Sequence, residues 1–266
     1  MQRLLVTGGC GYLGRELVRR APKRGWDVRA TWFQRPPDGA AEWVRADLRD
    51  PEDAAVAVAG IDAVIHTAYR QGEGEWEANF GGSAAVADAA RGLRLVHLSS
   101  DVVFDGTRGH YREEDAPAPV NSYGRSKTEA ERIVTELHRE ATIVRTSLIY
   151  GGNEPGPQER LAADGTRFFV DEIRSPVQVG DLAEALLEVV ALELPGPLHL
   201  GGADNLSRFD FAVLLGADPA TLEAAHTTPD RAPNVSLDST RAAALLSTRV
   251  RGAYEVLSSS AVRDAR

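Results

Sequence analysis

Residues 3–20 read RLLVTGGCGYLGRELVRR, an apolar run that is followed by closely spaced glycines and then by a helix-like stretch. The run Arg3–Thr7 is typical of a buried strand, and Gly14–Arg20 of a helix. Glycine is needed where a chain turns sharply, where its backbone approaches a pyrophosphate and where a helix packs on a strand. A tight turn alone could use glycines at positions 8, 11 and 14. Their place between the first strand and the first helix favours a dinucleotide-binding loop.

The alternation of strand and helix continues as far as Thr146. The further strands that we expect are Asp27–Trp32, Ala63–His66, Arg94–Ser99 and Thr142–Thr146. The further helices that we expect are Pro51–Val58, Glu75–Ala90 and Ser122–Leu137. Such alternation is typical of βαβ units with right-handed crossovers. It predicts an α/β fold with a doubly wound parallel sheet of the Rossmann type and helices on both faces.

The pattern loosens after residue 146. The stretch GGNEPGPQ at 151–158 is rich in turn residues and is expected to be a loop. Asp181–Leu192 predicts another helix and Pro197–Leu200 a short strand that rejoins the sheet, while Arg208–Leu215 and Ser239–Leu246 predict short helices.

From this we predict two domains. Residues 1–146, with about 178–200, would form a dinucleotide-binding domain. Residues 147–177 and 201–266 would form a small C-terminal α/β lobe that binds the substrate.

Composition limits the possible partners and location. The 266 residues are 43% hydrophobic and carry a net charge of −9, which argues against a nucleic acid or an acidic membrane as partner. The single cysteine, Cys10, makes no internal disulfide, and no apolar stretch resembles a signal peptide or a membrane span. We therefore expect a cytoplasmic protein that acts on a small molecule, with a homodimer as the assembly to consider.

The end of the second strand bears on the choice of cofactor. It reads Ala30-Thr31-Trp32-Phe33-Gln34-Arg35 and lacks the acid that usually binds the ribose hydroxyls of NAD. Arg35 could pair with a 2′-phosphate, and the Thr31 hydroxyl could donate a hydrogen bond there. The sequence therefore favours NADPH, with NADH as the alternative. Arg35 could also be a solvated turn residue.

Other candidate cofactor contacts follow the strands of the expected sheet. The glycine loop contributes Gly8, Gly11, Tyr12, Leu13 and Gly14. Asp47 and Leu48 could flank the adenine, and His66, Thr67 and Ala68 end the third strand at the ligand-binding edge. His66 could equally be a packed edge residue.

A serine, a tyrosine and a lysine follow in a suggestive order. Ser100 ends the fourth strand, and Tyr123 and Lys127 lie four residues apart at the start of a long helix. This spacing places both side chains on one helical face. Free tyrosine has a pKa near ~10, and a neighbouring ammonium lowers it by stabilising the phenolate. Ser100 could hold a substrate oxygen while Tyr123 gives or takes its proton.

In this order the motifs resemble the extended short-chain dehydrogenase/reductases. The likeness is carried by Thr7-Gly8-x-x-Gly11-x-x-Gly14, Ser99-Ser100-Asp101, Tyr123-x-x-x-Lys127 and Arg145-Thr146-Ser147. Within that superfamily, SSDVVFDG at 99–106 and NSYGRSK at 121–127 are most similar to the dTDP-4-dehydrorhamnose reductase family.

The resemblance implies roles for individual residues. Ser100 takes the place of the Ser/Thr of the catalytic triad, Tyr123 is the proton donor, and Lys127 binds the ribose and tunes the tyrosine. Asn79 matches an asparagine that supports the lysine and a proton-relay water, although a surface position in a helix is the alternative.

The substrate contacts implied by the resemblance are Ser100, Asp101, Tyr123 and Leu148. The reductases usually carry tryptophan where this chain has Leu148.

Three functions stay open on the sequence. The first is an NADPH-dependent reductase of a keto group on a sugar nucleotide or related metabolite, which Arg35 favours. The second is an epimerase or dehydratase that keeps its cofactor bound. The third is a non-catalytic NADP-binding regulatory subunit, like that of methionine adenosyltransferase, which the intact Ser100, Tyr123 and Lys127 disfavour. We predict no metal site, because the six histidines are scattered and no C-x-x-C motif occurs.

Overall fold

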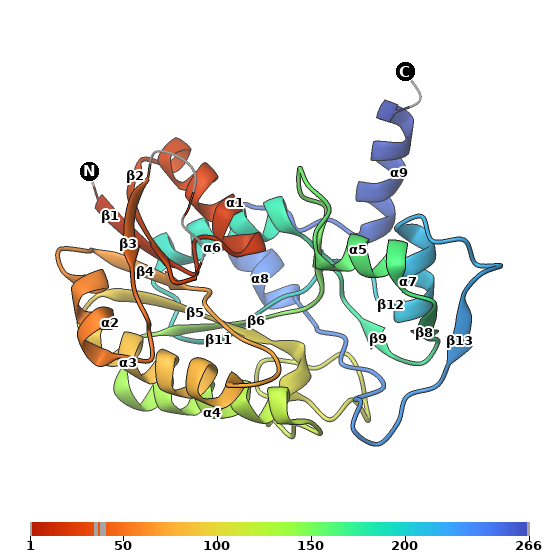
Figure 1. Ribbon diagram of the computed structural model, residues 1–266, viewed down its shortest axis with the longest axis horizontal. Coiled ribbons are helices and arrows are strands. Elements are labelled where there is room, and N and C mark those ends of the chain that lie inside the picture. Colours follow the sequence, from red (N-terminus) through yellow and green to blue (C-terminus); the bar gives the residue numbers. More distant parts are fainter. Residues whose placement is uncertain (1, 35–36, 38–40, 265–266) are drawn as a thin grey trace. The chain divides into compact units, whose positions relative to one another are not determined.

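A seven-stranded sheet forms the centre of the fold, in the order β11-β6-β5-β4-β1-β2-β3 (Figure 1). Its strands are β1 (Gln2–Thr7), β2 (Trp26–Trp32), β3 (Glu42–Arg45), β4 (Ala63–His66), β5 (Arg94–Ser100), β6 (Thr142–Thr146) and β11 (Gly196–Leu200). The neighbours from β3 to β5 pair in parallel. This order, read from β3 as 3-2-1-4-5-6, is that of a doubly wound sheet, so the predicted fold class is confirmed.

The strand order changes direction at β1, which has β2 on one side and β4 on the other. In such sheets, ligands bind outside the carboxyl ends of the strands at this switch point. Thr7 pairs with His66, and His66 pairs with His97, so β1, β4 and β5 reach the same level near their ends. The glycine loop leaves β1 at this level.

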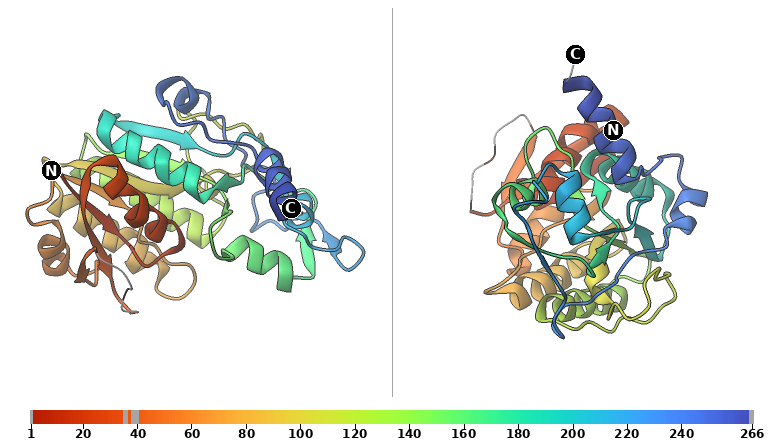
Figure 2. Two further views of the ribbon diagram at one scale, coloured as in Figure 1. Left: turned by 90° about the horizontal axis from the view of Figure 1, so that it is seen from above. Right: turned by 90° about the vertical axis from the view of Figure 1, so that its right-hand side faces the viewer.

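Helices lie on both faces of the sheet in all views (Figure 1 and Figure 2). One face carries α1 (Tyr12–Arg20) and α6 (Val179–Leu192), and the other carries α2 (Pro51–Val58), α3 (Gly82–Ala89) and α4 (Ser122–Leu137). The core under the second face combines Leu5, Val64, Leu95 and Ile143 of the sheet with Ala54, Ala57, Val86 and Val134 of the helices. Each large aliphatic side chain buried there contributes roughly 1.5–3 kcal/mol.

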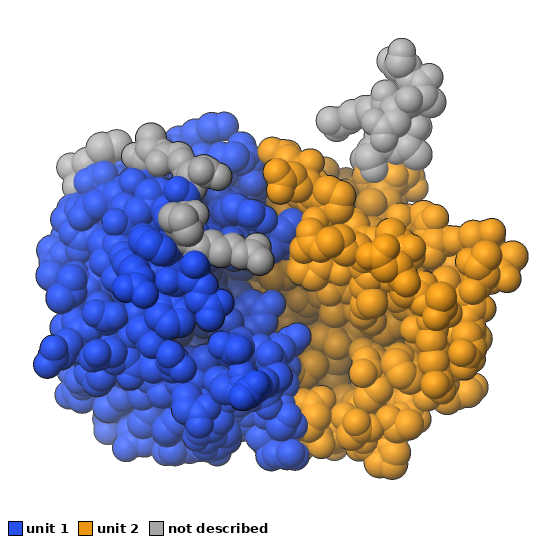
Figure 3. Space-filling model, viewed as in Figure 1, with its two compact units in different colours: residues 1–99, 122–144, 183–198 blue, residues 100–121, 145–182, 199–266 orange. Residues whose placement is uncertain are grey.

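The computed structural model describes residues 2–34, 37 and 41–264. The chain divides into two compact units (Figure 3). Unit 1 comprises residues 1–99, 122–144 and 183–198, and unit 2 comprises 100–121, 145–182 and 199–266. The sequence reading assigns 100–121 to the dinucleotide-binding domain, whereas here they belong to unit 2. The reason is local packing, because Phe104 and Tyr111 stack and share a core with Val235 and Leu237.

Unit 2 consists of short elements. Three two-stranded sheets pair β7 (Ile149–Tyr150) with β10 (Val177–Gln178), β9 (Ile173–Arg174) with β12 (Leu206–Ser207), and β8 (Arg167–Phe169) with β13 (Glu223–Ala225). Its helices are α5 (Pro157–Asp164), α7 (Arg208–Leu214), α8 (Thr240–Leu245) and α9 (Ala253–Asp264). None of the helices in the described residues is both long and apolar enough to cross a membrane.

One local prediction is wrong in part, and another gains a detail. The expected loop at 151–158 ends early, because α5 begins at Pro157, a favoured first helical residue, and Glu159 accepts a hydrogen bond from the Gly156 N–H. The expected helix Glu75–Ala90 is helical as far as Ala89, and its residues Glu77–Gly81 form a π-helical turn, η2, that leads directly into α3. Two 3-10 turns, η1 (Ala21–Arg24) and η3 (Asp101–Val103), complete the elements of the described chain.

Candidate active site

The glycine loop has a backbone that only glycine fits. Gly8 has a φ of +67°, its N–H donates to Thr31 Oγ1 at 3.0 Å, and the Gly9 N–H donates to the Thr31 carbonyl at 3.0 Å. The Gly11 N–H then donates to the Gly8 carbonyl at 2.8 Å. A Cβ at Gly14 would overlap that same carbonyl oxygen. The three spaced glycines therefore let the first turn of α1 pack directly on the loop.

Helix α1 starts at the end of this loop. Its N-cap is Gly11, which offers no side-chain cap, and no acidic residue lies in its first turn. The positive end of the helix dipole thus has no protein carboxylate in that turn to offset it. Of the two predicted contacts there, Tyr12 is half-buried and Leu13 is buried. A loop without side chains followed by a helix N-terminus fits the pyrophosphate of a dinucleotide.

The residues predicted to lie near the adenine and its ribose make different contacts within the protein. Thr31 is buried, and its hydroxyl oxygen accepts from the loop, so this side chain supports the glycine turn. Asp47 accepts from Arg49 Nε at 2.8 Å, and this contact with the guanidinium lowers the pKa of Asp47. Leu48 packs against the core beneath α2 and α3. Arg35, the expected phosphate contact, lies outside the described residues.

His66 occupies the interior. Its ring nitrogens lie 2.7 Å from Thr7 Oγ1 and 3.2 Å from Ser83 Oγ, and its ring stacks on His97 at 5.3 Å between centroids. Burial and, to a smaller extent, the positive charge of Lys127 lower the pKa of His66 to about 3. His66 is therefore a neutral packing residue at the end of β4.

Thr67 and Ala68 follow His66 and approach the glycine loop. The Thr67 hydroxyl donates to the Thr7 carbonyl at 2.7 Å. The backbone of Ala68 lies so close to Gly8 that a Cβ there would come within 2.9 Å of the Ala68 Cα. The structure thus brings both residues to the predicted nucleotide edge.

Tyr123 and Lys127 lie on consecutive turns of α4. Lys127 is only 3% exposed, and its ammonium donates to the Leu98 carbonyl of β5 at 2.7 Å. Burial lowers the pKa of Lys127 to about 8, and the carboxylate of Glu131 opposes that change. The Tyr123 ring lies 6.2 Å from that of Tyr69, which follows β4. The helix therefore brings a phenol and a buried ammonium to the edge where the glycine loop lies.

Asn79 is buried, not on the surface. It lies in the π-helical turn, where its Oδ1 accepts from the Arg70 N–H at 2.8 Å. Its Nδ2 donates to the Arg70 carbonyl and to Ser126 Oγ, both at 2.9 Å. Asn79 thus connects the loop after β4 to the residue before Lys127. Such π-turns are frequent at functional sites.

Glu131 is a residue that the sequence reading missed. It is 7% exposed and accepts a hydrogen bond from the Ser99 hydroxyl, one residue beyond the carbonyl that holds Lys127. A Lys–Glu pair at i,i+4 is typical of a solvated helix surface. The glutamate therefore carries no signal in the sequence that distinguishes it from an exposed one.

Unit 2 begins with Ser100 and Asp101. Asp101 is fully buried, forms an ion pair with Arg174, and accepts from Ser147 Oγ at 2.6 Å. The Ser100 hydroxyl donates to Asp101 Oδ1 at 3.1 Å and accepts from the Val102 N–H that begins η3. The carboxylate of Asp101 therefore orients Ser100.

Three arginines gather around two carboxylates, Asp101 and Glu172. Glu172 accepts from Arg174 at 3.3 Å and from Arg231 Nε at 2.8 Å. Arg208 donates to the neutral oxygen of Gln158 at 2.7 Å. Burial lowers the pKa of Arg208 to about 10, and the charge of Arg174 adds to that effect. This guanidinium cluster, Asp101, Glu172, Arg174, Arg208 and Arg231, thus carries one positive charge in excess.

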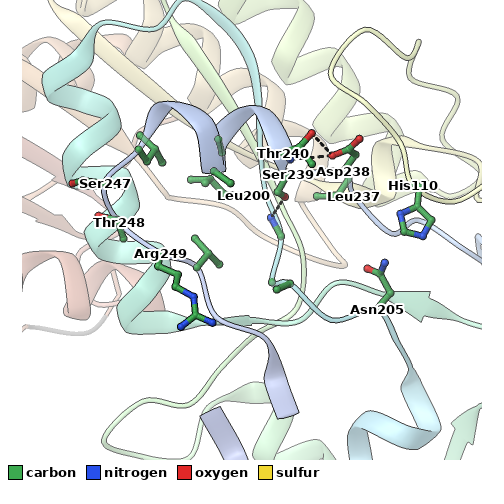
Figure 4. A pocket seen from close by; sticks show the side chains of 17 residues that line it. His110, Leu200, Asn205, Leu237, Asp238, Ser239, Thr240, Ser247, Thr248 and Arg249 are labelled. Carbon is green, nitrogen blue, oxygen red and sulfur yellow. Dashed lines mark hydrogen bonds between the residues drawn. The ribbon is translucent and has the colours of Figure 1, made fainter. Parts of the chain in front are cut away.

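Leu148, the expected substrate contact, packs beside Tyr150, Leu206 and Phe211 of unit 2. A separate cavity of about 540 Å³ lies within unit 2 beside α8 (Figure 4). Among its polar side chains, Ser239 Oγ accepts from the Gly201 N–H and Asp238 accepts from Thr240. The predicted site residues do not line it. Within the described chain, no three His, Cys, Asp or Glu side chains are grouped to hold a metal ion.

Comparison with known proteins gives concordant matches. Residues 1–259 match the family described as RmlD substrate binding domain. The chain is 35% identical over 250 residues to a dTDP-4-dehydrorhamnose reductase of Mycolicibacterium smegmatis, covering 86% of this chain and 71% of the relative. It is 26% identical over 259 residues to the methionine adenosyltransferase 2 subunit beta of Bos taurus, covering 86% and 75%.

A solved structure with one of these names has the same fold. The dTDP-4-dehydrorhamnose reductase of Bacillus anthracis, in complex with NADP, superposes with a TM-score of 0.82 at 25% identity and covers 97% of both chains.

Proposed function

Because the chain belongs to the RmlD substrate-binding-domain family, we propose that it is an NADPH-dependent reductase of a keto group on a sugar nucleotide. The observation that carries the proposal is the pair on α4, where Lys127 is buried against the end of β5 one turn after Tyr123. Two further observations support it: a relative that is 35% identical is a dTDP-4-dehydrorhamnose reductase, and a structure of the same fold with that name is in complex with NADP.

In this proposal the residues of unit 1 bind the cofactor and supply the proton. The glycine loop and the start of α1 hold the pyrophosphate, and Lys127 binds the nicotinamide ribose. When bound, NADPH supplies the hydride. Tyr123 donates its phenolic proton to the carbonyl oxygen of the substrate, and the ammonium of Lys127 stabilises the phenolate that is left.

The residues of unit 2 hold the substrate. On substrate binding the Ser100 hydroxyl gives up its hydrogen bond to Asp101 Oδ1 and donates its one proton to the reacting oxygen. The excess positive charge of the guanidinium cluster suits the diphosphate of a sugar nucleotide, since guanidinium–phosphate hydrogen bonds are charge-assisted. Arg208 is the member whose side-chain partner is neutral, so we assign it the phosphate contact.

The proposed reductase differs from the two other activities in its use of cofactor. A reductase consumes one NADPH per product, whereas an epimerase or dehydratase regenerates its cofactor and a regulatory subunit only binds it. The decisive assay mixes purified protein and NADPH with a panel of keto-sugar nucleotides and follows the nicotinamide absorbance. Stoichiometric loss of NADPH supports the reductase. Product formation without net loss would support the second activity.

Arg35 gives a test of the cofactor preference. If its guanidinium pairs with the 2′-phosphate, Arg35→Ala weakens NADPH binding by about tenfold to a hundredfold and leaves NADH nearly unchanged. Titration of the variant with both nucleotides measures this. An equal loss for both would mean that Arg35 only supports its loop.

A further inference from the structure

Two opposite charges on α4 reach adjacent residues of β5. Lys127 donates to the Leu98 carbonyl at 2.7 Å, and Glu131, one helical turn later, accepts from the Ser99 hydroxyl. Lys127 is 3% exposed and Glu131 is 7% exposed, so neither charge is well hydrated. Buried charges persist where they are paired and hydrogen-bonded.

The other groups around the ammonium do not supply a negative charge. His66 of β4 and His97 of β5 both have a pKa lowered by burial and by Lys127, so both are neutral at pH 7. Tyr123 lies one turn before Lys127 on the same helix. Among the described groups that face Lys127 from these elements, Glu131 is the carboxylate that favours the protonated lysine.

We propose that Glu131 is a positioning residue that keeps Lys127 protonated at the end of β5, with Ser99 fixing the carboxylate. Removing the negative charge disfavours the ammonium, so the lysine loses its proton at a lower pH. Ribose binding and stabilisation of the Tyr123 phenolate both need that proton. The inference rests on the proposed role of Lys127, and its test requires neither cofactor nor turnover.

The composition makes the test direct, because Lys23 and Lys127 are the only lysines in the sequence. Protein labelled with ¹³C-lysine gives two side-chain Cε signals, which Lys23→Arg assigns. We expect the Lys127 signal of the cofactor-free protein to titrate near pH 8. In Glu131→Gln we expect the midpoint to fall by about one unit or more, since removing a neighbouring opposite charge disfavours the ammonium.

Two further variants make the result interpretable. Ser99→Ala removes the hydrogen bond to the carboxylate, so we expect a smaller shift in the same direction. Glu129→Gln removes a charge from the same helix that pairs with Arg132 at the surface, so we expect no shift.

If the hydrogen bond between Ser99 and Glu131 only joined β5 to α4, its loss would change the stability of the protein but not the titration midpoint of Lys127. An unchanged midpoint in folded Glu131→Gln overturns the inference, and an unchanged midpoint in Ser99→Ala does so if the first variant does not fold. If the midpoint shifts but the wild-type protein oxidises no NADPH with keto-sugar nucleotides, the proposed role of Glu131 is supported and the proposed reductase activity is contradicted.

Discussion

Two groups of buried charges, one in each unit, differ in the kind of cation they use. Unit 1 buries a single lysine, Lys127, and Glu131 on successive turns of α4, whereas unit 2 surrounds Asp101 and Glu172 with arginines. A buried lysine can lose its proton near neutral pH, while a guanidinium keeps its charge throughout the physiological range. The first group is therefore suited to moving protons and the second to holding anions.

The largest expected effect is on turnover in Tyr123→Phe. The change removes one hydroxyl and keeps the ring, so the fold and NADPH affinity should be nearly unchanged. Loss of a positioned proton donor should lower kcat by about 10²–10⁴-fold. The measurement is NADPH oxidation with a saturating keto-sugar nucleotide. Tyr254→Phe, at a tyrosine that is 53% exposed on α9, is the control and should be fully active. Undiminished activity in Tyr123→Phe would mean that unit 1 only binds the nucleotide.

A large loss of stability is expected in Asp101→Asn. This change removes one of the two buried negative charges that pair with Arg174, leaving Glu172, and replaces one of the two oxygens that accept from Arg174 and Ser147 by an NH₂ donor. Breaking one side of a buried pair typically costs about 3–5 kcal/mol of unfolding free energy. Urea denaturation measures it, and Asp88→Asn, at a carboxylate that is 63% exposed beside Arg91, should change stability by less than ~0.5 kcal/mol. Equal effects of the two changes would contradict the importance of the buried pair.

Because of Lys127, we expect the stability of the protein to depend on pH above pH 8, a dependence that the arginines of unit 2 do not cause. The pKa of Lys127 is about 8 in the folded protein and 10.5 ordinarily, so between these values the unfolded chain binds more protons. Stability contributed through this residue therefore rises as pH rises from 8 to 10.5, by about 3 kcal/mol at most. Urea midpoints over this range measure the change. Lys127→Met should remove that rise, and a Lys127→Met protein with the same pH slope would contradict the prediction.

The smallest predicted effect concerns Arg208→Gln. If this guanidinium holds the diphosphate, its loss should raise the KM for the sugar nucleotide roughly tenfold to a hundredfold, with kcat nearly unchanged. Steady-state kinetics measures both constants. The matched control is Arg249→Gln, since Arg249 is exposed and pairs with Glu255. A fall in kcat without a change in KM would mean that Arg208 acts through Ser100 and not on the phosphate.

The glycine spacing and the alternation of elements were sufficient to predict the sheet. The boundaries of α2, β4, α4 and β6 agree with the predicted ones, because each has a strong apolar pattern and clear turn residues. Strand β3 was missed, since Glu42–Arg45 is four residues long with charged ends and is stabilised by pairing with β2.

The candidate site could be predicted in part. The glycine loop, Tyr123 and Lys127 have sequence signatures because their spacing is local. The pair of Asp101 and Arg174 has none, since 73 residues separate them and only the fold brings them together. Glu131 could not be predicted for a different reason. Its i,i+4 spacing from Lys127 also occurs on exposed helices, so the spacing does not distinguish a buried glutamate from an exposed one.

The division into units also bears on how the molecule could be taken apart. The chain passes from one unit to the other at 99/100, 121/122, 144/145, 182/183 and 198/199, and three of these points fall inside β5, β6 and β11. Neither unit is a continuous segment, so a truncation cannot isolate one of them, and a chimaera that exchanges unit 2 must replace three separate stretches. If unit 2 binds the substrate as proposed, the specificity of this enzyme is therefore expected to change through single substitutions there, and not through the exchange of a continuous domain.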